Sequence, residues 1–89
     1  MDSVELPEKS HLERTLAEAW TTHSEYQRNF LKGERDEVWA GWYAGFILGR
    51  LGHFTTPTIL TRLLEATEHK ENWAAAAAVY ILGALKQAS

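Results

Sequence analysis

The sequence predicts an all-α protein, a four-helix bundle-like domain built from two related helical hairpins. Apolar residues recur at the three- and four-residue steps of a helix face, and no run shows sustained strand alternation. Alanine fills residues 74–78, which strongly favours helix. A stretch that begins at Trp39 is echoed 34 residues later, from Trp73. These observations together predict helices only, in two related pairs.

Length and composition limit the classes of protein to consider. The 89 residues suffice for one domain, so we expect residues 1–89 to form a single helical domain, with residues 1–6 as a flexible N-terminus. The absence of Cys excludes a disulfide scaffold. The formal charge of −3 gives no general cationic field that would attract a phosphate backbone. We therefore expect no nucleic-acid partner.

The chain also lacks the features of a secreted or membrane protein. Its N-terminus, residues 1–7, is acidic and has neither the basic start nor the apolar core of a secretion signal. Two uncharged stretches, residues 38–49 and 72–85, are shorter than the ~18 to 20 apolar residues that cross a bilayer. We expect a cytoplasmic protein with no membrane partner, in which these stretches are buried helices.

The first predicted helix runs from about Pro7 to Lys32. Its start is open between Pro7, which suits a first-turn position, and a capping box formed by Ser10 and Glu13. Gly33 is the expected stop, because glycine tolerates the left-handed backbone that ends a helix. Residues at helical spacing define its apolar face: Leu12, Leu16, Trp20, His23, Tyr26 or Gln27, and Phe30.

Capping residues define the other three predicted helices. Asp36 is expected to cap the second helix, Glu37 to Leu51, and Gly52 to end it. The third helix has Thr56 as its cap and Pro57 as its first residue, and it is predicted to continue to Glu68. Asn72 is expected to cap the fourth helix, from Trp73 to about Gln87.

The echo between the second and fourth helices includes a Trp, an Ile-Leu-Gly triplet and a final Leu, and it pairs Phe46 with Tyr80. A weaker echo relates residues 14–19 to residues 61–66. We interpret the pattern as two helical hairpins, the second with a shortened first helix. Two copies are too few for a solenoid.

The second and fourth helices are apolar nearly all round, and four short helices cannot cover both. This excess predicts a homodimer; the alternatives are another protein partner or a monomer with exposed aromatic residues. The candidate interface lies on the second helix and consists of Gly41, Gly45, Gly49 and Phe46. We expect small residues of the fourth helix to pack on this glycine groove, namely Ala74, Ala75, Ala78 and Gly83. The alternative is that a glycine makes room for a ligand or a bulky Trp.

Several aromatic side chains could line a hydrophobic ligand pocket. The candidate ligand-binding residues are His23, Tyr26, Trp39, Trp42 and Tyr43. The alternative is that these side chains are core residues, because aromatic residues at helical spacing commonly pack inside a protein. We expect His23 to be a hydrogen-bonded core residue and not a catalyst.

No constellation points to enzyme chemistry, so we assign no catalytic residue, no metal ligand and no cofactor. Glu8 and His11, and likewise Glu65 and His69, bring two ligand types to one helix face, but no second pair completes either site. The chain has no nucleophile elbow and no phosphate-binding glycine loop. A DNA-binding helix-turn-helix is also disfavoured, because Arg62 is the only interior cation of the third helix.

One motif carries a resemblance. Ala19-x-x-x-His23-x-x-Tyr26, followed by Asp36-x-x-Trp39-x-x-Trp42-Tyr43-Ala44, resembles a group of small bacterial helical proteins of uncharacterised function. The resemblance covers roughly residues 12–52, and some relatives look like modules attached to glyoxalase-type domains. It implies an all-helical fold without implying an activity. The fourth helix then looks like a degenerate second copy, with Ala76 and Ala77 in the places of Trp42 and Tyr43.

Taken together, these features predict a non-enzymatic helical module that self-associates and binds a further protein. The alternative is a small protein that binds a hydrophobic ligand in a pocket lined by Trp, Tyr and His.

Overall fold

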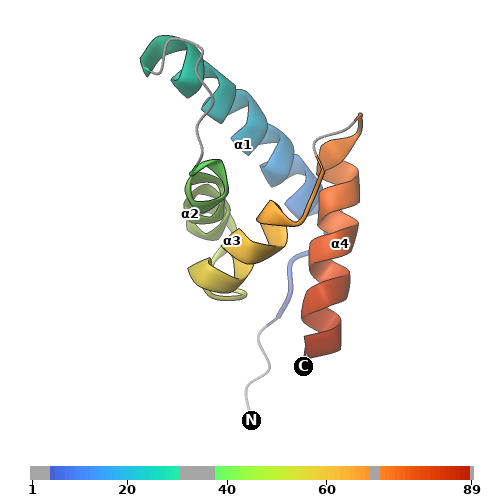
Figure 1. The fold of residues 1–89 in the computed structure, drawn as a ribbon. Helices are drawn as coiled ribbons and strands as arrows, with labels where there is room; N and C mark the ends of the chain where they lie inside the picture. The colour runs from blue at the N-terminus through green and yellow to red at the C-terminus, as the bar shows by residue number, and fades with distance from the viewer. Residues whose placement is uncertain (1–4, 31–37, 69–70, 89) are drawn as a thin grey trace.

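The computed structural model describes residues 5–30, 38–68 and 71–88, and these ranges contain helices and no strand. In chain order the helices are α1 (Lys9–Phe30), α2 (Trp39–Leu51), α3 (Pro57–Glu65) and α4 (Trp73–Ala88) (Figure 1). The all-α prediction is confirmed. None of these helices combines the length and the apolar content that a membrane span requires.

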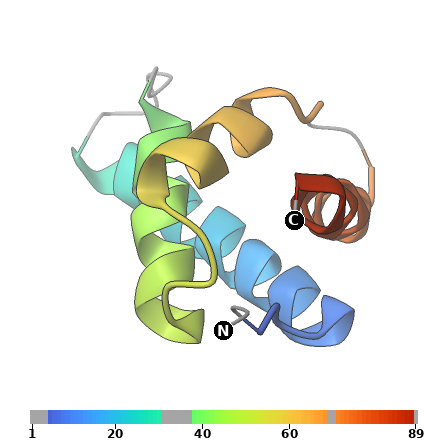
Figure 2. The same ribbon diagram turned by 90° about the horizontal axis from the view of Figure 1, so that it is seen from below.

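The four helices form a ring in which each helix packs against two others (Figure 2). α1 contacts α2 on one side and α4 on the other, and α3 bridges α2 and α4 across the ring. The backbones of α2 and α4 do not approach each other. The longest helix, α1, with 22 residues, therefore serves as the base on which α2 and α4 are mounted separately.

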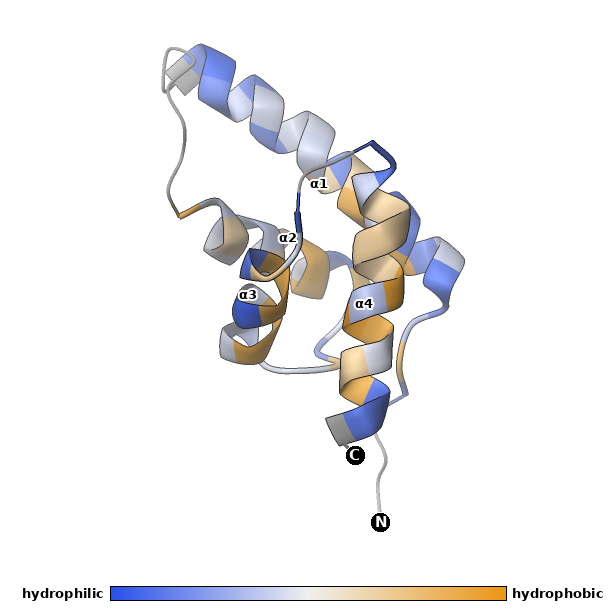
Figure 3. Cartoon of the chain, turned by 45° about the vertical axis from the view of Figure 1, so that its right-hand side comes forward, coloured by the Kyte–Doolittle hydropathy of each residue, from blue (hydrophilic) through white to orange (hydrophobic). Residues whose placement is uncertain are grey.

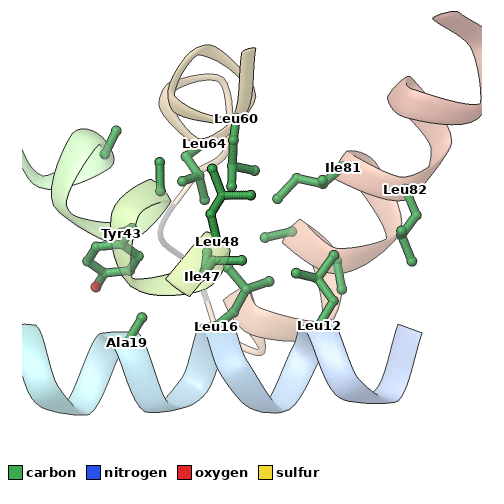
Figure 4. Close-up of a cluster of buried hydrophobic side chains, with 14 of the residues drawn as sticks. Leu12, Leu16, Ala19, Tyr43, Ile47, Leu48, Leu60, Leu64, Ile81 and Leu82 are labelled. Atoms are coloured by element: carbon green, nitrogen blue, oxygen red, sulfur yellow. The ribbon is translucent and has the colours of Figure 1, made fainter. Parts of the chain in front are cut away.

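Apolar side chains from all four helices meet inside the ring (Figure 4). Each of the largest of these side chains is fully or almost fully buried, so each stabilises the fold by roughly 1.5 to 3 kcal/mol through removal from water. The central ones are Leu12 and Leu16 of α1, Ile47 and Leu48 of α2, Leu60 and Leu64 of α3, and Ile81 and Leu82 of α4.

The start of α1 differs from both sequence predictions. The helix begins at Lys9, and the Glu8 carbonyl accepts the first helical hydrogen bond from the Leu12 amide at 3.0 Å. Ser10 lies inside the first turn, so the predicted capping box is wrong. Glu13 instead accepts a hydrogen bond from Lys9 Nζ at 3.1 Å, in an exposed ion pair. The expected stop at Gly33 lies outside the described residues.

The N-terminal segment that the sequence predicts to be flexible contains one contact with the core. Leu6 is half-buried and packs against the apolar interior. Residues 1–4 lie outside the described part of the chain.

The observed ends of α2 and α3 follow local hydrogen bonding. α2 starts after Val38, whose side chain provides no cap; the predicted cap, Asp36, lies outside the described residues. Gly52 ends the helix as predicted, with a φ of 88° that favours glycine. α3 begins as predicted, because Thr56 Oγ1 accepts from the Ile59 amide at 3.1 Å and Pro57 follows.

α3 ends at Glu65, three residues before the predicted end. The Thr67 hydroxyl donates to the Leu64 carbonyl at 2.6 Å and so occupies an acceptor at the helix end. α4 begins at Trp73 as predicted, preceded by Asn72 in a left-handed conformation with a φ of 61°. The Asn72 carbonyl accepts from the Ala76 amide at 3.1 Å.

The echo between α2 and α4 corresponds to a common pattern of burial. Four core residues of α2 have equivalents 34 residues later in α4, and all eight residues are buried. The pairs are Tyr43 with Ala77, Ala44 with Ala78, Ile47 with Ile81, and Leu48 with Leu82. α2 and α4 therefore use the same helix face for the core.

The weaker echo between α1 and α3 has no such correspondence. Leu16 is buried but its equivalent, Leu63, is only half-buried, whereas the exposed Ala17 corresponds to the buried Leu64. The two segments are thus out of register with respect to the core. Only α2 and α4 share a face in the way that the sequence predicts for repeated elements.

Candidate functional site

The five candidate ligand-binding residues do come together, where α1 packs against α2. We call His23, Tyr26, Trp39, Trp42 and Tyr43 the aromatic cluster. The His23 ring centroid lies 4.9 Å from that of Trp42, 5.3 Å from that of Tyr43 and 5.9 Å from that of Tyr26. Trp39 joins through an edge-to-face contact with Tyr43 at 5.2 Å. These distances are those of directly packed rings.

Burial shows how the aromatic cluster is used. His23 is 3% exposed and Tyr43 is 4% exposed, whereas Tyr26 at the outer end of the cluster is 36% exposed. The rings of the cluster fill the space between α1 and α2 with one another. This geometry matches the core alternative, and the ligand-binding role of the five residues stays a prediction.

Tyr43 is the titratable group of the cluster whose environment changes it most clearly. Burial raises the pKa of the phenol to about 12, because the charged form would be desolvated. Tyr43 therefore stays neutral near pH 7 and is a poor general base.

Three further aromatic residues extend the cluster beyond the predicted set. Trp73 of α4 lies 5.6 Å from Tyr43 and 5.4 Å from Trp20, and so connects α1, α2 and α4 through their rings. Phe46 stacks on Trp42 at 5.4 Å. Trp73 is not among the five candidate residues, although its equivalence to Trp39 was a signal for including it.

The glycine stripe of α2 lies on the outer surface of the ring. Gly41, Gly45 and Gly49 are all exposed. Among the described residues, a Cβ atom placed on any of them meets nothing within 4 Å apart from the backbone of its own helix and its chain neighbours. We call this surface the glycine face; it also includes Val38, which is 73% exposed, and the half-buried Trp42 and Phe46.

The expected packing of α4 on the glycine groove is wrong within one chain. α2 and α4 are separated in the ring, and the buried alanine Ala78 faces the core beside Ile81. The small residues of α4 allow it to approach α1 and α3 instead. The role of Gly41, Gly45, Gly49 and Phe46 as an interface with another molecule stays a prediction.

One end of the glycine face carries a charge that is already engaged. Arg50 donates to Glu18 of α1 at 2.9 Å, and its guanidinium carbon lies 4.9 Å from the Phe46 ring centroid. Both partners of the ion pair are exposed, so the pair contributes at most about 1 kcal/mol to stability. Its main consequence is to hold Arg50 away from the glycines.

Two of the surface depressions formed by the described residues include Trp73, which borders the aromatic cluster. One, of about 340 Å³, is lined by Trp20, Trp73 and neighbouring small residues of α1 and α4. The other, of about 370 Å³, lies between the end of α3 and the first turns of α4. We call the second depression the α3–α4 hollow.

Within the described ranges, no three His, Asp or Glu residues are grouped so as to hold a metal ion. One of the two pairs considered from the sequence, Glu65 with His69, lies partly outside these ranges.

No known protein family, curated protein or solved structure matches the chain. The resemblance to small bacterial helical proteins therefore stays a prediction based on the motif.

Proposed function

We propose that this protein is a non-enzymatic helical module that functions as a homodimer through the glycine face of α2. The observation that carries the proposal is the exposure of three interior helix glycines with no neighbour that requires them. An interior glycine destabilises a helix by roughly 0.5 to 1 kcal/mol relative to Ala. The fold of the single chain gains nothing in return, whereas a second helix could use the flat surface for close packing.

The layout of the glycine face is suited to self-association. Gly45 lies midway between Gly41 and Gly49, so an antiparallel pair of α2 helices would place Gly45 near the twofold axis. Gly41 of one copy would then lie opposite Gly49 of the other. Exposed Val38 and half-buried Trp42 and Phe46 supply apolar area beside this stripe. The face has the self-complementary character that an isologous contact needs.

Sedimentation equilibrium at micromolar concentration tests the proposal. The expected mass is twice the chain mass of 10.1 kDa, falling toward the chain mass on dilution. A folded chain that remains monomeric throughout the micromolar range would refute homodimerisation. Binding of a different protein to the same face, the alternative in this class of function, would then become the explanation to test.

The resemblance to the small bacterial helical proteins belongs to this proposal. Its motif residues Trp39, Trp42 and Tyr43 pack against one another and against His23, which supports a shared structural role for the motif. No activity follows from it. We place the module in the cytoplasm on the basis of its acidic, Cys-free composition.

A further inference from the structure

The α3–α4 hollow has aromatic walls and a floor of alanines. Trp73 and Tyr80 of α4 contribute the rings, and Ala76 and Ala77 lie between them in the sequence. Thr67, just beyond the end of α3, lines the opposite side. Most residues of α4 are hydrophobic (Figure 3).

Because α2 and α4 share the same core positions, the residues that line the hollow can be compared with their equivalents in α2. Because Ile47 and Leu48 of α2 correspond to Ile81 and Leu82 of α4 in both sequence and burial, the positions in between can be compared directly. The walls Trp73 and Tyr80 then correspond to Trp39 and Phe46. The floor residues Ala76 and Ala77 stand where α2 carries Trp42 and Tyr43.

In α2 the Trp42 and Tyr43 rings fill the space against the preceding helix. They pack on His23 of α1 at 4.9 and 5.3 Å, and Trp42 also stacks on Phe46 at 5.4 Å. In α4 the preceding helix, α3, has only nine residues and ends at Glu65. The second copy thus keeps two aromatic residues, the almost fully buried Trp73 and the exposed Tyr80, but it lacks the rings of Trp42 and Tyr43, and its preceding helix is shorter.

We propose that the α3–α4 hollow is a binding site for a planar aromatic small molecule of about the size of indole. Its volume of about 370 Å³ is at the lower end of the range for ligand pockets, which suits one bicyclic ring system and not a helix. Indole is the ring that Trp42 places at the equivalent point of α2. The site is independent of the glycine face, which lies on a different helix.

Polar groups at the hollow favour recognition by ring contact. The Thr67 hydroxyl donates to the Leu64 carbonyl at 2.6 Å and accepts from Trp73 Nε1 at 3.0 Å, so its bonding capacity is largely used.

Titration of the isotope-labelled protein with indole, followed by amide NMR, tests the site. We expect saturable shifts centred on Thr67, Ala76, Ala77 and Tyr80, with a Kd on the order of 1 mM. Shifts centred on the aromatic cluster, or on the depression at Trp20, would overturn the proposal.

Two variants and a control make the test specific. Ala76→Trp restores the ring that α2 carries at the equivalent position, and it should weaken indole binding at least tenfold by occupying the hollow. Ile59→Trp adds the same side chain at an exposed apolar position of α3 outside the hollow, and it should leave binding unchanged.

Tyr80→Ala removes one wall and provides a second test if Ala76→Trp disturbs the fold. It should also weaken binding at least several-fold. Unchanged indole affinity in a folded Ala76→Trp or Tyr80→Ala protein would refute the site. A failure of homodimerisation would leave these expectations intact, because neither residue belongs to the glycine face.

Discussion

Replacement of Gly45 by Leu separates the folding role of the glycine face from its proposed role in association. Within one chain the added side chain enters open space, since a Cβ at Gly45 meets nothing within 4 Å outside its own helix backbone and chain neighbours. Removal of an interior helix glycine should therefore stabilise the monomer by up to about 1 kcal/mol. For a domain of this size that corresponds to a rise in Tm of roughly 4 to 8 °C.

In the dimer the same Leu would lie where two backbones meet. Overpacking of this kind costs about 1 to 3 kcal/mol, so the dimer Kd should rise by roughly 5- to 150-fold. The wild-type Tm should increase with protein concentration, because association stabilises the folded state by mass action. The Tm of the Gly45→Leu variant should be higher than wild type at low concentration and should change much less with concentration.

Gly83→Leu is the matched control. Gly83 is an interior glycine of α4, and a Cβ placed there also meets nothing within 4 Å. This variant should show the same gain in monomer stability without loss of the dimer. A higher Tm for Gly45→Leu at every concentration, with an unchanged oligomeric state by sedimentation, would refute packing at the glycine face.

Three further predictions concern the fold and the aromatic cluster. Because the pKa of Tyr43 is raised to about 12 from the ordinary value of 10, the folded state binds more protons than the unfolded state between these values. Tyr43 should contribute on the order of 2 kcal/mol to the free energy of unfolding below pH 10, and this contribution should be lost as the pH rises through 12. Urea unfolding at several pH values across this range should show the decrease. In Tyr43→Phe the part of the decrease that is due to Tyr43 should be absent. Thr67→Val should destabilise the protein by about 1 to 2 kcal/mol in urea unfolding, because Trp73 Nε1 and the Leu64 carbonyl both lose their hydrogen bond to the Thr67 hydroxyl. As a control, Thr21→Val on the exposed face of α1 should change stability by less than about 0.5 kcal/mol. Thr56→Ala should lower the stability by about 0.5 to 2 kcal/mol through loss of the α3 cap. Thr56→Ser keeps the acceptor oxygen and should retain most of the wild-type stability. Equal stability of the Ala and Ser variants would exclude a capping role.

The parts of the fold that the sequence predicted correctly depend on local signals. Thr56 followed by Pro57 fixes the start of α3, and Gly52 marks the end of α2, because a side-chain acceptor and a positive φ are needed at those points. The same kind of signal was misleading at Ser10. There a capping-box pattern occurs one residue inside the helix, where Lys9 competes for Glu13.

The arrangement of the helices was harder to predict, because it depends on contacts between distant residues. Small residues on both α2 and α4 suggested that these helices pack together. In the structure α1 is long enough to hold them apart, and Trp73 reaches Tyr43 through its ring at 5.6 Å without backbone contact. Periodicity identifies the apolar face of each helix, but it does not say which faces meet.

The sequence predicted correctly that the residues of the aromatic cluster lie together, but it did not decide whether they bind a ligand or fill the core. Helical spacing placed His23 on the same face as Leu16, and the echo drew attention to Trp39 and Trp42. Whether such rings enclose a cavity or fill it depends on packing, which sequence does not encode in any local pattern. The sequence shows that Ala76 replaces Trp42 at the equivalent position, but only the structure shows the hollow beside it.

The comparison between α2 and α4 also suggests how one helix pattern can serve two purposes. Both helices keep the same four core positions, so the interior constrains each of them equally. The remaining positions differ: α2 has Gly45 where α4 has Val79, and α4 has Ala76 where α2 has Trp42. α2 thus combines a filled aromatic cluster with a flat outer face, while α4 combines an open hollow with a bulkier exterior, since Val79 is 56% exposed. If association and ligand binding are separate properties of the two helices, exchange of residues at these equivalent positions should alter one property at a time.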